Sequence, residues 1–178
     1  MKLILASLFA ALVVPANPAL AEPLKAISND RAVVGGAVMT SGRTVVENLS
    51  GSIDHARFIR MIKAAGAREK LSGNGPVTVF APRDTAFRNK RPDDVFAYMV
   101  PGRVTVREVK RRTGHHGFIH LTTLSGHPVS LQIVGGKLWV HDVSGNAYRV
   151  RRADVMSSNG VIHVLENDIK TTGDRNGG

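Results

Sequence analysis

The stretch "NGPVTVFAPRDTAF", residues 74–87, changes abruptly from one kind of backbone to another. Its first half, Val77 to Phe80, is an apolar and β-branched run of the kind that forms a strand buried on both faces. Pro82 restricts its own φ angle and biases Ala81 toward extended backbone, so the strand should end there. Asp84 can then accept hydrogen bonds from the free amides of a following helical turn, as an N-cap. We therefore interpret the junction as structural rather than catalytic.

The segments around this junction predict helices first and strands later. "SIDHARFIRMIKAAG", residues 52–66, places apolar side chains on one helical stripe, with Ser52 available as N-cap and Gly66 at the end. From residue 118 onward the period changes to that of strands: "FIHLTTL", "PVSLQIV" and "KLWVHDV" are separated by Gly-containing turns, and "GVIHVL" follows. This order is typical of an α+β domain.

The two ends of the sequence differ in composition from its middle. Residues 1–21 have a positive start, a short apolar stretch and an Ala-x-Ala site before Glu22, so we expect a secretory signal peptide. We expect an N-terminal arm or linker over residues 22–45, one domain over 46–169 and a flexible tail over 170–178. Lys2 is the only charged residue before Glu22, so the remainder carries a net charge of +9, one less than the full +10. There is no cysteine, so stability must come from packing.

Two long motifs indicate a family. "TVFAPRDTAF" and "SSNGVIHVLEND" resemble the two signatures of the fasciclin-like (FAS1) domain family, and "IRMIKAAGAREKL", "VPGRVTVREV" and "RRADVM" stand in the family's order between and around them. The resemblance covers roughly residues 45–169. It implies an α+β wedge of two small packed β-sheets with several surrounding helices. In that fold the signatures lie together, so "VTVFAP" and "GVIHVL" should pair or pack on each other, with His163 buried and hydrogen bonded.

The same resemblance implies a role in adhesion. Members of this family are extracellular binding modules, and their integrin-binding segments lie before the second signature and at a Tyr-His pair between the signatures. The matching positions here are Asp154, Val155 and Met156 for the first segment and Tyr98 for the second. Met99 replaces the histidine, which weakens the case for Tyr98. Asp154 is equally suited to be a turn residue before the "SSNG" loop.

Basic residues indicate a second kind of partner. Arg107, Lys110, Arg111 and Arg112 fall on one short predicted helix, and arginine favours bidentate contact with carboxylate, sulfate and phosphate groups. We expect a surface protein or an acidic polysaccharide as partner. We do not expect nucleic acid, because aromatic residues that could stack on bases are few. No segment after the signal is long and apolar enough to cross a membrane, and we expect a monomer that associates at most peripherally with the cell envelope.

The histidines suggest an alternative class of function. His115, His116 and His120 lie in "GHHGFIH", a loop that runs into a predicted strand, and could bind Zn²⁺ or Cu²⁺ in a small-ligand or metal-binding periplasmic protein. No acidic residue or cysteine lies nearby in sequence to complete such a site, so we expect neither metal nor cofactor. We also expect no enzymatic activity, because the sequence lacks a G-x-S-x-G elbow, a P-loop and a dinucleotide-binding motif. An exported adhesion or surface-interaction module is therefore the favoured interpretation.

Overall fold

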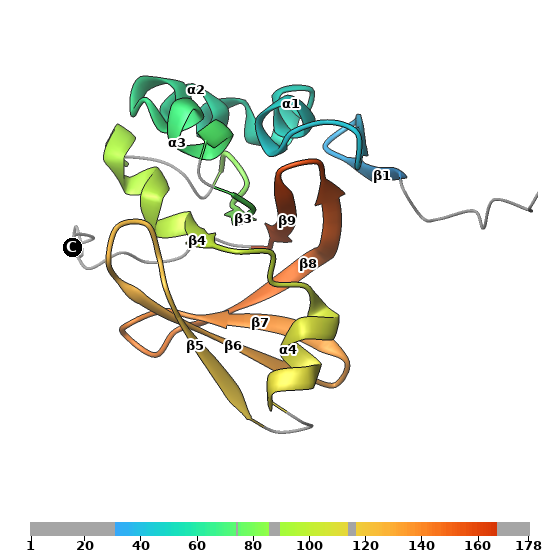
Figure 1. Ribbon diagram of the computed structural model, residues 1–178, viewed down its shortest axis with the longest axis vertical. Coiled ribbons are helices and arrows are strands. Elements are labelled where there is room, and N and C mark those ends of the chain that lie inside the picture. The colour runs from blue at the N-terminus through green and yellow to red at the C-terminus, as the bar shows by residue number, and fades with distance from the viewer. Residues whose placement is uncertain (1–30, 74, 86–89, 114–116, 167–178) are drawn as a thin grey trace, which may run out of the picture.

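Two sheets and a set of short helices form the fold of the computed structural model, which describes residues 31–73, 75–85, 90–113 and 117–166 (Figure 1). The helices are α1 (Val45–Ser50), η2 (Ile53–His55), α2 (Ala56–Ala64), α3 (Ala67–Gly73), η3 (Pro92–Tyr98) and α4 (Val106–Thr113). The strands are β1 (Arg31–Val34), β2 (Ala37–Thr40), β3 (Val77–Ala81), β4 (Met99–Pro101), β5 (Phe118–Thr122), β6 (Pro128–Val134), β7 (Lys137–His141), β8 (Ala147–Ser157) and β9 (Gly160–Leu165). Helices α1 to α3 gather at one end of the molecule, whereas β5 to β7 and α4 occupy the other.

The larger sheet has seven strands in the order β4-β3-β9-β8-β7-β6-β5. Its centre is the parallel pair of β3 and β9, in register from Val77 opposite Gly160 to Ala81 opposite Val164. Every residue of both strands is buried, as expected for apolar runs covered on both faces. The pairing of the two signature segments predicted from the sequence is therefore confirmed.

Strand β8 joins the two halves of this sheet. Its first residues pair with β7, and its last residues pair with β9. The register shifts between Val150 and Arg152 and again before Val155, and Asp154 adopts a φ of 55°. Such bulges bend a strand and increase its twist. The bend gives the sheet its two halves, whose inner side chains contribute to one hydrophobic core.

Part of the expected N-terminal linker belongs to the folded domain, which corrects the prediction for residues 31–45. Strands β1 and β2 form a hairpin around Gly35 and Gly36, both at positive φ. One face of the hairpin buries Ala32, Val34 and Met39 in the core. The segment shows alternation over only four residues a strand, which is too short for a secure prediction from periodicity.

The junction after β3, at Arg83 and Asp84, contacts the start of α2. The carboxylate of Asp84 accepts hydrogen bonds from the backbone N–H groups of Arg57 at 2.9 Å and Phe58 at 3.3 Å, so it caps the first turn of α2. The Asp84 amide donates to the carbonyl oxygen of Asp54 at 2.8 Å, and Arg83 forms an ion pair with the Asp54 carboxylate at 3.3 Å. The helical turn expected to begin at Asp84 falls on residues 86–89, outside the described residues.

Helix α2 shows why a cap from elsewhere is needed. It begins after the short η2 turn, and neither His55, its N-cap, nor Ser52, the N-cap of η2, makes a side-chain cap hydrogen bond. The Ser52 hydroxyl instead bonds to Nδ1 of His55 at 2.8 Å. The helix buries Phe58 and Ile62 against the core, with the Phe58 ring edge-on to Tyr98 at 5.8 Å. Within the described ranges, every helix is too short or too polar to cross a bilayer.

Candidate functional site

The bend in β8 brings a second carboxylate to a helix start. The Asp154 side chain accepts the backbone N–H of Val106 at 2.9 and 3.2 Å, at the first residue of α4. This bond satisfies one of the amides that a helix leaves free at its N-terminus. The backbone N–H of Asp154 donates to Nδ1 of His163 at 3.2 Å. Asp154, which family resemblance predicts as a partner-binding residue, thus holds the start of α4 against the sheet.

His163 lies directly behind this contact and is completely buried. Because Nδ1 accepts from Asp154, the proton must sit on Nε2, which donates to the carbonyl oxygen of Val104 at 2.8 Å. The ring also stacks on Phe80, with centroids 5.7 Å apart. Burial lowers the pKa of His163, although the Val104 carbonyl and the Asp154 carboxylate act in the opposite direction. A neutral imidazole therefore connects β9, β8 and the segment before α4.

This neutral histidine should make stability depend on pH. A histidine whose pKa is lower in the folded than in the unfolded state binds fewer protons when folded, so its stabilisation is complete above the unfolded pKa of about 6.5 and is lost as pH falls toward the folded value. We expect His163→Gln to reduce the slope of unfolding free energy against pH by up to about 1.4 kcal/mol per pH unit below pH 6.5. Denaturant unfolding at several values between pH 7.5 and 5 measures this slope.

An exposed histidine supplies the control. His127→Gln removes an exposed histidine, so comparison of the two variants isolates the contribution of the buried ring. His55 is also buried, and burial lowers its pKa, so part of the slope should remain in the His163 variant. An unchanged slope in His163→Gln would show that His163 is not the titrating group.

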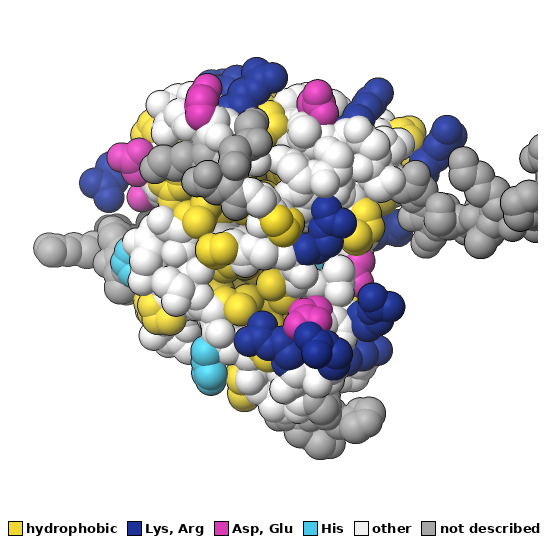
Figure 2. Space-filling view, viewed as in Figure 1, with side chains coloured by type: hydrophobic (Ala, Val, Ile, Leu, Met, Phe, Trp, Pro, Cys, Tyr) yellow, Lys and Arg dark blue, Asp and Glu magenta, His cyan; other side chains and the backbone are white. Residues whose placement is uncertain are grey.

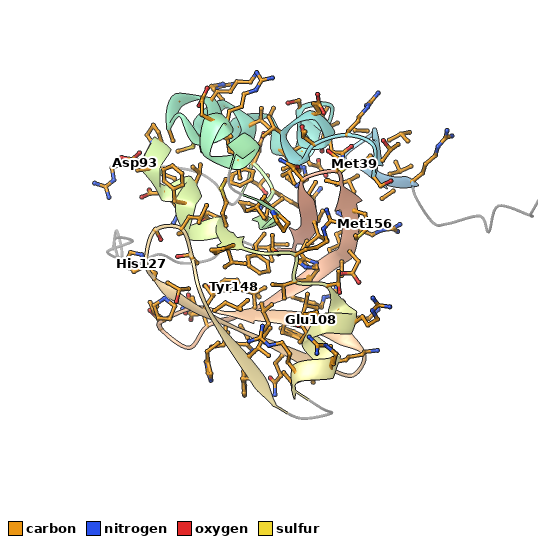
Figure 3. The ribbon with its side chains drawn as sticks, viewed as in Figure 1. Met39, Asp93, Glu108, His127, Tyr148 and Met156 are labelled. Carbon is orange, nitrogen blue, oxygen red and sulfur yellow. The ribbon has the colours of Figure 1, made fainter. Side chains whose placement is uncertain are left out.

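A hollow of about 340 Å³ opens between the β1–β2 hairpin and β8, next to the bend. It is lined by Ala32, Met39, Arg152, Ala153, Asp154, Val155 and Met156. Figure 3 shows Met39 on the hairpin side and Met156 on the β8 side. The lining combines thioether and methyl groups with one cation and one carboxylate, which suits an amphipathic group on a partner.

The residues predicted by family resemblance are not all accessible. Tyr98 is fully buried, which corrects its expected place on a partner-binding surface. Val155 is only 2% exposed, whereas Asp154 and Met156 are half-buried. Of the four positions, the structure brings Asp154, Val155 and Met156 to the hollow and places Tyr98 in the core, in T-shaped contact with Phe58. The sequence did not indicate that Met39 and Arg152 would join them.

The exposed surface of α4 carries the predicted basic cluster, which we call the α4 basic face: Arg107, Lys110, Arg111 and Arg112. All four side chains are exposed, and Figure 2 shows Lys and Arg side chains gathered over this helix. Arg111 forms an ion pair with Glu108 at 2.7 Å, and this hydrogen bond lowers the pKa of Glu108. The other three make no hydrogen bond or ion pair within the described part of the chain. Their charges are therefore available to an anionic partner.

The histidine cluster is only partly described. His115 and His116 lie outside the described residues. His120 is exposed on β5, and its Nδ1 bonds to the Ser130 hydroxyl at 2.8 Å. Among the described residues no three His, Cys, Asp or Glu side chains come together in a way that could hold a metal ion. The described part of the chain thus offers no observation that supports the metal-binding alternative.

Comparisons with known proteins agree with this architecture. The model of the Fasciclin domain family matches residues 54–170. Protein sll1483 of Synechocystis sp. is 31% identical over 151 residues, which cover 76% of this chain and 77% of that protein. Mouse Stabilin-1 is 30% identical over 134 residues, which cover 71% of this chain but only 5% of Stabilin-1.

A solved structure shows the same fold. The FAS1 domain pair of the insect cell adhesion molecule Fasciclin I matches with a TM-score of 0.60 at 17% identity. The match covers 72% of this chain and 51% of that one. At this identity the likeness concerns the fold, and the chain spans about half of the matched structure.

Proposed function

This chain belongs to the fasciclin domain family, and on that premise we propose that it is an exported surface-interaction domain that binds acidic polysaccharide through the α4 basic face. The family includes a cell adhesion molecule, which supports adhesion as the general role. The signal-like pattern of residues 1–21 supports export to the periplasm or the extracellular space. We propose binding rather than catalysis as its activity.

The exposure of α4 carries this proposal. Three of its cations have no partner among the described residues, and they lie within two turns of helix, so their fields add over a short distance. A polyanion can contact several of them at once with successive charged groups, so its binding gains from each of these cations. Asp154 and His163 support the proposal indirectly, because they hold the start of α4 in place.

The test removes charge without breaking the ion pair of α4. We expect Arg107→Gln with Arg112→Gln to weaken binding to polygalacturonate at low salt by roughly 2-fold to 30-fold, since each of the two lost ion pairs contributes about 0.2–1 kcal/mol. The attraction should fall for both proteins as the Debye length shrinks from about 10 Å at 0.1 M salt to about 3 Å at 1 M. Binding is measured by calorimetry or by retention on immobilised polymer across a salt series.

A matched variant separates the local effect from that of net charge. Arg60→Gln with Lys63→Gln removes the same two charges from the exposed side of α2. Equal weakening by both pairs would show that net charge alone governs binding. If binding is the same at all salt concentrations and is not weakened by Arg107→Gln with Arg112→Gln, the proposal is wrong.

A surface protein is the second candidate partner, and the hollow beside Asp154 favours it. The hollow is lined by the three positions that match the family's partner-binding segment, of which Asp154 and Met156 are half-buried, together with Met39 and Arg152. An apolar side chain next to an acidic group on a partner would fit this lining. Such binding should persist at high salt, which distinguishes it from binding at α4.

A further inference from the structure

The outer face of strands β5 to β8 has an unusual composition. Antiparallel pairing places two rows of side chains across the strands on this face, which we call the outer sheet face. The first row is Phe118, Gln132, Trp139 and Arg149, and the second is His120, Ser130, His141 and Ala147. The alternate residues of each strand, such as Leu131 and Val140, are buried in the core. The other side of this half-sheet is therefore fully used for packing, and the two rows face outward.

Two aromatic rings stand on the outer sheet face. Phe118 is 46% exposed, and its ring makes a T-shaped contact with His141 at 5.1 Å and a stacked contact with His120 at 6.5 Å between centroids. Trp139 is half-buried, two strands away, which corresponds to about 10 Å between backbones. Polar groups lie between and beside the rings: the amide of Gln132 and the paired side chains of His120 and Ser130. Solvated sheet faces usually carry polar residues, so exposed rings among hydrogen-bonding groups need an explanation.

The charged side chains on strands β5 to β7 are all basic. The sequence contains no acidic residue between Glu108 and Asp142. Lys137 is exposed on β7, two residues before Trp139 and thus on the same face. Arg149 ends the first row and forms an ion pair with Glu166 at 2.7 Å, so one carboxylate stands at the β8 margin. An anionic ligand would therefore meet no negatively charged side chain on β5 to β7.

We infer that the outer sheet face is the contact surface for the sugar rings of an acidic polysaccharide. Pyranose rings present C–H groups on one face and hydroxyl groups around the edge. The C–H groups pack on the faces of Phe118 and Trp139, where aromatic π-electrons concentrate negative charge. Gln132 and His120 hydrogen bond hydroxyl groups, and Lys137 pairs with a ring carboxylate. The separation of the two aromatic rings suits a short oligosaccharide rather than one sugar.

This inference rests on the proposed function and divides it between two surfaces. The α4 basic face attracts the polymer by charge, whereas the outer sheet face recognises it as a sugar. Helix α4 packs against β5 and β6, and its Val109 belongs to the same core as the inward-facing residues of these strands, so the two surfaces lie on opposite sides of them. A polymer chain that wraps the β5 edge can reach both.

Trp139 is the only tryptophan of the chain, so its fluorescence reports on this face alone. The intact protein is titrated at 0.5 M salt with oligogalacturonate, which has carboxylates on sugar rings, and with polyglutamate, which has carboxylates without rings. We expect oligogalacturonate to shift Trp139 emission saturably and polyglutamate to leave it unchanged. Phe118→Ala should weaken the oligogalacturonate response by about tenfold, as loss of an aromatic anchor does. Gln132→Ala tests the hydrogen-bonding groups in the same way.

The controls separate this inference from the proposed function. Ile53→Ala removes a side chain that is 78% exposed on η2, away from the face, and should change nothing. If oligogalacturonate and polyglutamate bind alike at low salt and neither shifts Trp139 emission, the outer sheet face is not a sugar site although α4 still attracts polyanions. If Phe118→Ala responds like the wild type, the inference is also wrong. If oligogalacturonate still shifts Trp139 emission in the variant with both Arg107→Gln and Arg112→Gln, and polyglutamate does not bind, the outer sheet face is a sugar site. The same result would contradict the proposed role of α4.

Discussion

Replacing Phe80 with alanine is expected to lower the free energy of unfolding by about 3–5 kcal/mol, the usual cost of truncating a fully buried phenylalanine. Phe80 lies at the centre of β3, is completely buried and stacks on His163 across the parallel pair. The change leaves a cavity between the two signature strands, which the surrounding sheet can fill only partly because its backbone is fixed by hydrogen bonds on both sides. Denaturant unfolding followed by circular dichroism measures the loss.

The same substitution elsewhere in the chain is the control. Phe118 is 46% exposed, so Phe118→Ala removes the same atoms from a surface position and should cost less than about 1 kcal/mol. The contrast isolates burial from side-chain chemistry. Similar losses for the two variants would mean that Phe80 is not in a packed core, and that the pairing of β3 with β9 is not the centre of the fold.

The sequence predicts this centre well because its chemical signal is local. Val77 to Phe80 and the run that contains His163 are continuously apolar, which is what a strand buried on both faces requires. Family resemblance then supplied the pairing of the two strands, which periodicity alone does not show. The hairpin of β1 and β2 was missed because each strand is only four residues long.

The roles of the two aspartates show where sequence reasoning ends. Asp84 and Asp154 are residue types that cap helices, but a sequence does not reveal which helix each one caps. Asp84 caps α2, 27 residues earlier in the chain, and Asp154 caps α4, 48 residues earlier. The contact of Asp154 depends on how the sheet bends at β8. Both carboxylates are therefore part of the scaffold that presents the candidate surfaces.

The sequence also did not show which of the candidate site residues are exposed. Tyr98 ends a short 3-10 helix, where no sustained period indicates which side chains point inward. The basic residues of α4 were easier to predict, because a short helix that buries one valine leaves its long charged side chains on the solvent side. The outer sheet face could have been found from the alternation in "FIHL", "SLQI" and "KLWVH", once the residues between the buried ones had been examined together.

Gly160→Ala is expected to lower the free energy of unfolding by about 3 kcal/mol or more, at the upper end of the cost of overpacking. A Cβ atom on Gly160 would overlap the carbonyl oxygen of Val77, its parallel partner, and would come within 3.0 Å of the Val77 carbonyl carbon. These are backbone atoms of a buried strand, so they cannot move aside as the end of a flexible side chain can. Relief requires β3 and β9 to separate where the second signature begins.

Gly42→Ala provides the matched comparison, because a Cβ atom there meets nothing within 4 Å and the residue does not have a positive φ. It should leave stability unchanged or raise it slightly, since alanine reduces the freedom of the unfolded chain. Thermal unfolding should show the midpoint of Gly160→Ala lowered by about 6–12 °C, and that of Gly42→Ala within about 2 °C of the wild type. If the two variants have the same unfolding midpoint, Gly160 does not lie as close to the Val77 backbone as the structure places it. The parallel pair of β3 and β9 would then be looser at its first residue pair, Val77 and Gly160. The buried contact between Phe80 and His163, further along the strands, would be the main interaction between the two signature segments.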